Sequence, residues 1–231
     1  MTARLVVFVT VATAGVLLQA QTNSYVSPLG HRYTYDTSSE TDNQFDGTDR
    51  KASKTSFVSG AMQKFKNLEE FVVTLPSDSL MLHHNPPISK SATSERVAEE
   101  KHNVMVNAFV YAIQQEADND YHIILGSDPK RSKKIFFNIE VSGLPDQQSP
   151  YYKKLSSIRA YCDKYLGNFI QSGKYHKFQQ PILVSVGGSI FYDIDHKPGV
   201  VGPAGMRPNT AWEIHPVTFL KFEPKMKPAG Q

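Results

Sequence analysis

The feature that most constrains the fold is a succession of five β-type segments, interrupted once by a helix, in the second half of the chain. Three segments rich in β-branched and aromatic residues come first, at 104–113, 120–126 and 135–144, and short polar connections join them. Two more segments of this kind follow at 181–195 and 210–222. This order predicts an antiparallel meander, one helix and two further strands.

The segment between the third and fourth strands has the periodicity of a helix. Ser149 is a candidate N-cap, Pro150 suits the first helical position and Gly173 marks the exit. Apolar residues recur there at spacings of three and four, at Leu155, Ile158, Cys162, Leu166 and Phe169. The spacing predicts one helix that buries a single apolar face against the sheet.

Strand-strand-strand-helix-strand-strand is the order of the OB-fold, a small, partly open five-stranded barrel. Gly187 and Gly188 interrupt the fourth strand, where such a barrel has a bulge or a sharp bend. The sequence therefore predicts a mainly β protein with one helix, an OB-fold-like five-stranded barrel over residues 104–223 and an N-terminal extension.

The segments that precede the predicted barrel differ from it in composition. Residues 1–20 have one early cation, Arg4, an apolar run and a small residue, Ala20, at the end. This layout is typical of a signal peptide, cleaved near Ala20, and predicts a secreted or periplasmic protein. Residues 21–56 are rich in Ser, Thr, Asp and Asn and predict a flexible leader or a loosely docked arm. We expect residues 57–103 to pack on the barrel and residues 224–231 to form a tail.

Composition limits the classes of function. The formal net charge is +3 and falls to +2 without Arg4, so a nucleic-acid partner would need a local basic patch. Cys162 is the only cysteine, which excludes an intramolecular disulfide, and its helical apolar neighbours predict a buried thiol. No segment after residue 20 is apolar for long enough to span a bilayer. The oligomeric state stays open.

An unusual pattern of polar residues lies on three of the predicted strands. The stretch AWEIHPV, residues 211–217, places Glu213 and His215 on one face of the last strand. In the predicted barrel the third strand lies between the second and the fifth. Alternation then brings together His122, Glu140, Glu213 and His215, with Asp120 on the same face and Asp118 just before it. Asp193, Asp195 and His196 are expected further away.

Three interpretations of this polar face remain open. In the first, His122, His215 and Glu213 bind zinc, calcium or a similar ion, Glu140 or Glu213 is a catalytic carboxylate, and the protein is a metal-dependent hydrolase or phosphodiesterase. In the second, the same residues form a structural salt bridge or a solvated sheet face. The motifs HExxH and CxxC are absent.

The third interpretation, which the fold favours, is a binding protein. OB-folds bind oligonucleotides or oligosaccharides across the second and third strands and the adjoining loops. A basic loop between these strands supplies candidate ligand-binding residues, namely Lys130, Arg131, Lys133 and Lys134, and Asp118 and Asp120 are candidates near the start of the second strand. The predicted partner is a nucleic acid, a glycan or another anionic molecule.

Four motifs resemble a group of uncharacterised, mostly bacterial secreted proteins. They are EADNDYHIIL, FFNIEV, VGGSIFYDIDH and WEIHPV, and the resemblance covers residues 97–222. The third motif matches only approximately in its spacing, and no activity is known for the group. The resemblance implies that Asp120, His122, Glu140, Glu213 and His215 form one motif set. The topology also resembles staphylococcal-nuclease-like barrels, but the acids and two arginines of those nucleases are not recognisable here.

Overall fold

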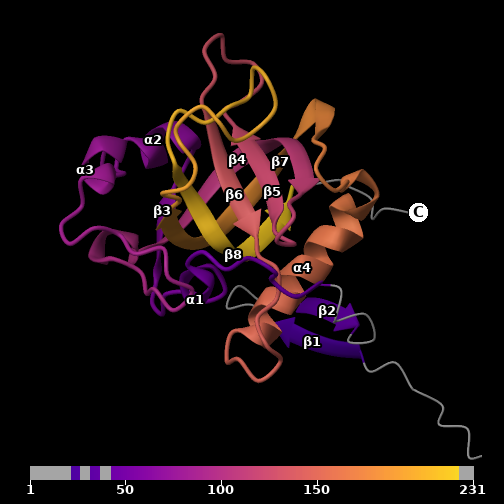
Figure 1. Ribbon diagram of the computed structural model, residues 1–231. Coiled ribbons are helices and arrows are strands. Elements are labelled where there is room, and N and C mark those ends of the chain that lie inside the picture. The colour runs from indigo at the N-terminus through magenta and orange to yellow at the C-terminus, as the bar shows by residue number, and fades with distance from the viewer. Residues whose placement is uncertain (1–21, 27–31, 37–42, 224–231) are drawn as a thin grey trace, which may run out of the picture.

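The computed structural model describes residues 22–26, 32–36 and 43–223 (Figure 1). The predicted signal peptide at 1–20 and the tail at 224–231 lie outside the described residues. Within them the protein is mainly β, as the sequence predicts, and one of its four α-helices is longer than seven residues.

The central element is a six-stranded sheet with the strand order β3-β4-β5-β6-β8-β7. Its strands are β3 (Met62–Phe65), β4 (Asn103–Gln115), β5 (Tyr121–Gly126), β6 (Phe136–Val141), β7 (His176–Tyr192) and β8 (Trp212–Phe222). Each of the five predicted strands corresponds to one of β4 to β8. Strand β3, which sequence reasoning left undefined, adds a parallel neighbour to β4.

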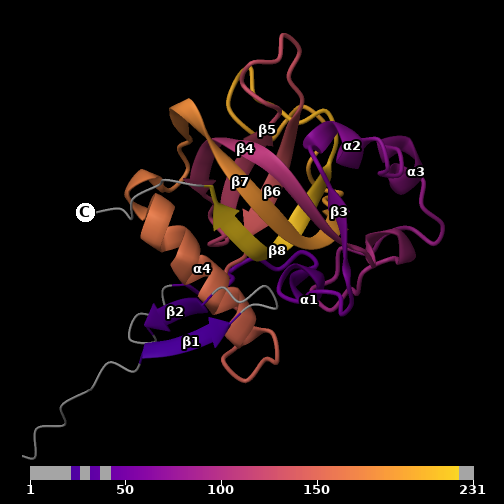
Figure 2. The same cartoon turned by 180° about the vertical axis from the view of Figure 1, so that it is seen from behind.

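The strand pairing closes on itself, because β7 at the end of the strand order also pairs with β4. Strand β4 pairs antiparallel with β5 on one side and with β7 on the other, so β4, β5, β6, β8 and β7 form a closed cycle of neighbours. Strands β6 and β8 pair in parallel, which the intervening helix and β7 make possible, and the remaining pairs of the cycle are antiparallel. The two views in Figures 1 and 2 show the strands curving around a common centre.

The predicted irregularity at the glycine pair is present. The register of β7 against β8 shifts on both sides of Gly188. A Cβ atom at Gly188 would run into the carbonyl oxygen of Pro216 on β8, so only glycine lets the two backbones approach this closely.

Helix α4 (Tyr152–Leu166) covers one end of the sheet and contacts β6 and β8. It buries the predicted residues Leu155, Ile158, Cys162 and Leu166, whereas Phe169 falls in the short 3₁₀ helix η3 (Gly167–Phe169). The helix begins at Tyr152, two residues after the predicted first position, Pro150. Ser149 instead forms a turn in which its carbonyl accepts the Tyr152 N–H.

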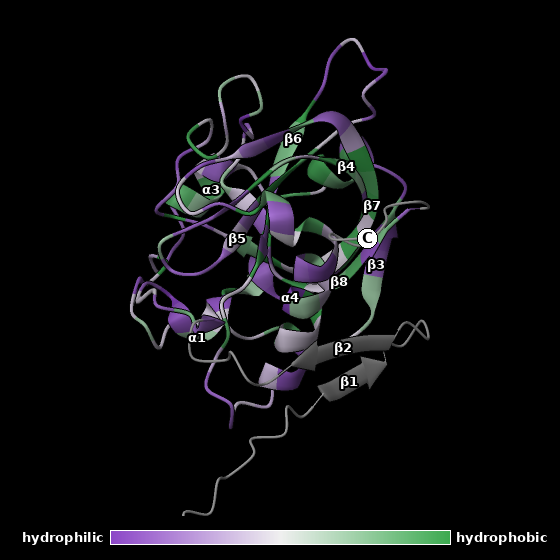
Figure 3. Cartoon of the chain, turned by 90° about the vertical axis from the view of Figure 1, so that its right-hand side faces the viewer, coloured by the Kyte–Doolittle hydropathy of each residue, from purple (hydrophilic) through white to green (hydrophobic). Residues whose placement is uncertain are grey.

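The N-terminal part of the described chain surrounds this body. Strands β1 (Thr22–Val26) and β2 (Arg32–Asp36) pair with each other, and this hairpin lies against α4 (Figure 1). Short helices α1 (Lys51–Lys54), α2 (Leu68–Val72) and α3 (Asp78–Leu82) and the 3₁₀ helix η2 (Ala98–Glu100) follow. Hydrophobic residues concentrate in the strands and hydrophilic ones in the loops (Figure 3). Among the described helices, none combines the length and the apolar character needed to cross a membrane.

Residues 43–56 belong to the segment that composition predicts to be a flexible leader, yet they pack on the body. Phe45 and Arg50 are 2% and 1% exposed. The Arg50 guanidinium donates to both carboxylate oxygens of Glu100, each at 2.7 Å, and lies 4.4 Å from the centre of the Phe191 ring. Composition allows a loosely docked arm but does not predict firm docking, because a buried ion pair and a cation–π contact, rather than aliphatic side chains, hold the segment.

Candidate functional site

The two faces of β5, β6 and β8 differ in character, as their alternation predicts. One face contributes Ile123, Ile139 and Ile214 to the hydrophobic core. The opposite face carries the polar residues, because successive strand residues point to opposite sides. His122 pairs directly with Glu140 across β5 and β6, and Asn138 pairs with Glu213 across β6 and β8.

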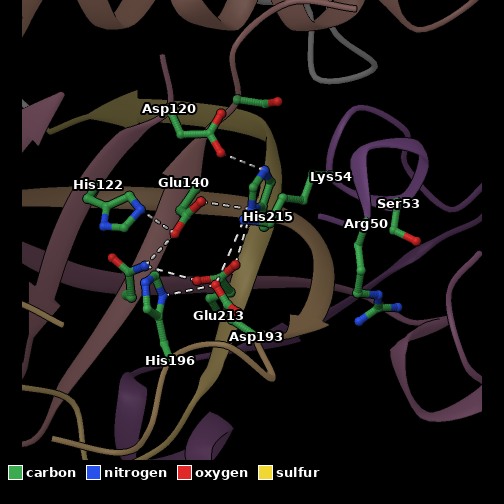
Figure 4. Close-up of polar contacts among 12 residues, drawn as sticks. Arg50, Ser53, Lys54, Asp120, His122, Glu140, Asp193, His196, Glu213 and His215 are labelled. Atoms are coloured by element: carbon green, nitrogen blue, oxygen red, sulfur yellow. Dashed lines mark hydrogen bonds and ion pairs between the residues drawn. The ribbon is translucent and has the colours of Figure 1, made fainter. Parts of the chain in front are cut away.

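His215 lies at the centre of the polar face and is fully buried. Its Nδ1 atom lies 2.9 Å from Glu140 Oε2 and 3.1 Å from Glu213 Oε1. Its Nε2 atom lies 3.4 Å from Asp120 Oδ2 (Figure 4). One imidazole therefore faces three carboxylates from three different strands or their ends.

His122 extends this arrangement toward the surface. Its Nε2 atom lies 2.7 Å from Glu140 Oε1, and its Nδ1 atom lies 3.2 Å from Glu116 Oε1. The two oxygens of Glu140 thus face two different imidazoles. Carboxylates and imidazoles alternate from buried Asp120, through His215, Glu140 and His122, to the partly exposed Glu116.

Asn138 fixes the orientation of the two central glutamates. Its side-chain nitrogen donates to Glu140 Oε1 at 2.9 Å and to Glu213 Oε2 at 3.0 Å. Its Oδ1 atom is buried and has no hydrogen-bond partner in the described chain. Because the amide holds both carboxylates from one side, their remaining oxygens face the imidazoles.

Asp193 and His196 join the cluster, which corrects the expectation that they lie further away. His196 Nδ1 is 2.9 Å from Asp193 Oδ2, and the ligand atoms of both residues lie within 4.8 Å of one in Glu213. Strand order alone could not place them, because they lie in the long loop that follows β7. This loop folds back over the sheet: a Cβ atom at Gly202 would lie 3.2 Å from Ile124 on β5.

Lys54 is a member of the cluster that sequence reasoning missed. Its Nζ atom lies 3.8 Å from Asp193 Oδ2, and the side chain is 12% exposed. Helix α1 is positioned by Arg96, whose Nη2 atom donates both to Ser53 O at 2.7 Å and to His215 O at 2.6 Å. The segment that was assigned to a leader therefore delivers a cation to the site.

A cavity of about 330 Å³ opens beside this cluster. Its walls come from the segment after residue 43, from the β4–β5 connection and from the loop after β7. The lining residues are Phe45, Gly47, Thr48, Asp49, Lys54, Glu116, Ala117, Asp118, His122, Asp193, Asp195 and His196. Five of them are carboxylates, so the cavity favours cations or neutral polar ligands over unscreened anions.

The imidazoles and carboxylates shift one another's pKa values. Burial alone would raise the pKa of Glu140, but His122 and His215 outweigh it and hold that pKa well below its usual range. Burial opposes the charge on His122, yet Glu140 and Glu116 raise its pKa to about 9. The Asp193 carboxylate raises the pKa of His196 to about 9, and His196 and Lys54 overcome the burial of Asp193 and lower its pKa to about 2.

Two other carboxyl groups shift in the opposite direction. Burial raises the pKa of Asp120 well above its usual value, and His215 compensates only in part. Burial and the neighbouring charges of Glu140 and Asp193 raise the pKa of Glu213 as well. Lys54 has a raised pKa despite its burial, because Glu140, Asp193, Glu213 and Asp120 surround it. The cluster thus holds more carboxyl groups than its own cations neutralise.

Six buried atoms of this cluster have no hydrogen-bond partner within the described residues. They are Asp120 Oδ2, His122 Nδ1, Asn138 Oδ1, Glu140 Oε2, His196 Nδ1 and His215 Nε2. Five of them lie 2.9–3.4 Å from an oppositely charged atom in an ion pair, whereas Asn138 Oδ1 has neither kind of contact among the described residues. Buried polar atoms in folded proteins are nearly always paired, so this oxygen indicates a bound ion or solvent. Two sets of three residues each bring ligand atoms within 4.8 Å of one another: Asp120, Glu140 and His215, and Asp193, His196 and Glu213.

The other candidate residues lie apart from the centre of the cluster. Asp118 lines the cavity, and its side chain accepts the backbone N–H of Asp120. The basic loop with Lys130, Arg131, Lys133 and Lys134 follows the far end of β5, and Arg131 pairs with Glu69 at 3.2 Å. Cys162 is fully buried, as predicted, and burial raises the pKa of its thiol.

Comparison with models of protein families, with curated proteins and with solved structures finds no match to this chain. The resemblance to secreted bacterial proteins therefore stays a prediction, and the function has to be argued from the geometry of the site.

Proposed function

We propose that this protein is a metal-dependent hydrolase whose divalent ion is held by Asp120, Glu140 and His215. The observation that carries this proposal is the convergence of three fully buried ligand groups, each of which offers an atom within 4.8 Å of the other two. Imidazole and carboxylate groups are common ligands of zinc.

The charge of the cluster supports an ion rather than a purely structural role. Lys54, His122 and His196, all with a raised pKa, compensate Glu140 and Asp193, whose pKa values are lowered, whereas the pKa values of buried Asp120 and Glu213 stay raised. Buried carboxylates without compensating cations are strongly destabilising. A divalent ion supplies that compensation. The imidazole ligand favours zinc or a similar transition metal over calcium, which prefers oxygen ligands alone.

The position of the cluster supports hydrolysis. A bound divalent ion lowers the pKa of a water molecule and polarises a carbonyl or phosphoryl oxygen. His122 lines the cavity and is held by Glu140, so its imidazole is placed to exchange a proton with a group that enters. A substrate in the cavity would also meet Lys54 and His196, which line it.

The OB-fold remains our proposal for the architecture. The closed cycle of five strands, the parallel pairing of β6 with β8 and the position of α4 between β6 and β7 support it. The cavity lies between the β4–β5 and β7–β8 connections, which are the loops that OB-folds use for ligands. The same observation favours a second candidate function, in which this face binds a neutral polar ligand such as a glycan without catalysis.

We also propose that the mature chain acts outside the cytoplasm. The layout of residues 1–20, with Arg4, an apolar run and Ala20, supports this location.

The proposed function is tested by loading the purified chain with zinc, removing the excess and measuring bound metal and thermal melting. We expect stoichiometric zinc, a lower melting temperature after treatment with EDTA, and loss of zinc in His215→Ala. His83→Ala, which changes an exposed histidine outside the cluster, is the matched control and should bind zinc normally.

Activity is then assayed with the loaded protein on chromogenic phosphate, carboxyl and glycosyl esters. We expect hydrolysis of one class, abolished by EDTA and restored by zinc. A loaded protein that binds a glycan but hydrolyses none of these esters would support the second candidate function instead. A chain that retains no metal and melts at the same temperature with and without zinc contradicts the metal site.

A further inference from the structure

The second set of ligand atoms, from Asp193, His196 and Glu213, shares no residue with the first. It is nevertheless adjacent, since Glu213 Oε1 lies 3.1 Å from His215 Nδ1. The Asn138 amide also joins the two sets by donating to Glu140 in one and to Glu213 in the other. Because the two neighbouring sets share no ligand residue, each can hold an ion of its own.

A small cavity provides an independent indication of a ligand at this second position. It has a volume of about 10 Å³, and Asn138, His196 and Glu213 are among its lining residues. A void of this size is about enough for a single water molecule or ion. The buried Oδ1 atom of Asn138, a cavity-lining residue 3% exposed, has no partner among the described residues.

The ligand atoms of Asp193 and His196 mainly contact each other. Asp193 Oδ1 accepts the backbone N–H of Asp195, which leaves Oδ2 for another partner. Lys54 Nζ approaches Oδ2 only to 3.8 Å, which is beyond hydrogen-bonding distance. His196 Nδ1 pairs with Oδ2 at 2.9 Å, so the two ligand atoms contact each other and a bound ion would replace the proton between them.

We infer that Asp193, His196 and Glu213 bind a second divalent ion, so that the centre is binuclear. This inference rests on the proposed metal site and extends it. Two adjacent ions hold both the attacking and the leaving oxygen of a displacement, which is the arrangement of many phosphatases and nucleases. The second ion lies on the cavity side, because Asp193 and His196 line the large cavity whereas His215 is buried behind them.

The test is the number of ions per chain in the full-length protein and in variants of each set. We expect two zinc ions in the wild type, one in His196→Ala and one in Asp193→Asn. His83→Ala should retain two. With manganese, electron paramagnetic resonance should show a coupled pair in the wild type and an isolated ion in His196→Ala. His196 is about one-third exposed, and thermal melting of both variants shows whether each is folded.

Three other results would contradict either the second metal position, the binuclear centre or the proposed function. One ion in the wild type that is kept by His196→Ala and lost by His215→Ala refutes the second position and leaves the proposed function intact. Two ions with uncoupled spectra refute a binuclear centre. No bound ion in the wild type refutes the proposed function together with this inference.

Discussion

The Arg50–Glu100 cluster and the cluster around His215 are both buried in the described part of the chain, and they differ in how completely their atoms are paired. In the first, Glu100 accepts two hydrogen bonds at each carboxylate oxygen, from the Arg50 guanidinium and from the backbone N–H groups of Tyr192 and Val97. The atoms left over there are the Nε donors of Arg50 and Arg96. In the second, the atoms left over are carboxylate, amide and imidazole atoms.

This difference separates a structural ion pair from a candidate binding site. A cation cannot use leftover guanidinium donors, but it can use the lone pairs of Asp120, Glu140 and His215. Both clusters depend on the same N-terminal segment, since Arg50 belongs to the first and Lys54 approaches the second. One ordered segment thus locks the fold with one side chain and delivers a charge to the site with another.

The largest expected effect comes from removing Glu100 from the first cluster, in which its carboxylate oxygens are fully hydrogen-bonded. Glu100→Ala leaves the Arg50 guanidinium buried without its carboxylate, and we expect the free energy of unfolding to fall by about 3–5 kcal/mol. Urea unfolding of the metal-free protein measures this loss. The matched change Glu99→Ala removes a partly exposed carboxylate one residue away and should cost less than about 1 kcal/mol. Similar losses in both variants would contradict a structural role for Glu100.

In the second cluster, around His215, a substitution should change the affinity for metal rather than mainly the stability. Glu140→Gln keeps the shape of the side chain but removes the charge that faces two imidazoles. We expect the affinity for zinc to fall by about 100-fold or more, because a ligand should matter at least as much as the groups that orient it. Competition with a fluorescent chelator measures the affinity. Unchanged affinity would place the ion elsewhere.

Sequence reasoning recovered the part of the site that regular strands determine. Strand alternation and order predicted that His122, Glu140, Glu213 and His215 share a face, because a pleated strand fixes the direction of each side chain. Lys54 was missed and His196 was expected further away, because they lie in a short helix and a long loop whose positions depend on tertiary contacts. Arg96 illustrates the difficulty: it joins α1 to β8 through two backbone carbonyls, a contact that no local pattern encodes.

A smaller effect on metal affinity is expected from replacing Lys54, the cation of the second cluster. Lys54→Met removes a positive charge that competes with a metal ion for the same carboxylates, so the affinity for zinc should rise by roughly tenfold. Lys51→Met, on the same helix, is the control, because that amine donates to the carbonyl of Phe45. A fall in affinity in Lys54→Met alone would mean that Lys54 orients the ligands rather than competing with the ion.

The smallest effect is a pH dependence that belongs to His196 in the metal-free protein. Asp193 raises the pKa of His196 from 6.5 to about 9, so the protonated imidazole is favoured in the folded state. Its contribution to stability is therefore fully present below pH 6.5 and is lost as the pH rises through about 9. Melting temperatures of the wild type and of His196→Gln, measured in EDTA across this range, isolate the contribution, because His122 titrates in both proteins. We expect the advantage of the wild type to shrink as the pH rises. An advantage that stays constant or grows would show that the Asp193–His196 contact is not an ion pair, and the loop after β7 would then be held over the site by its packing alone.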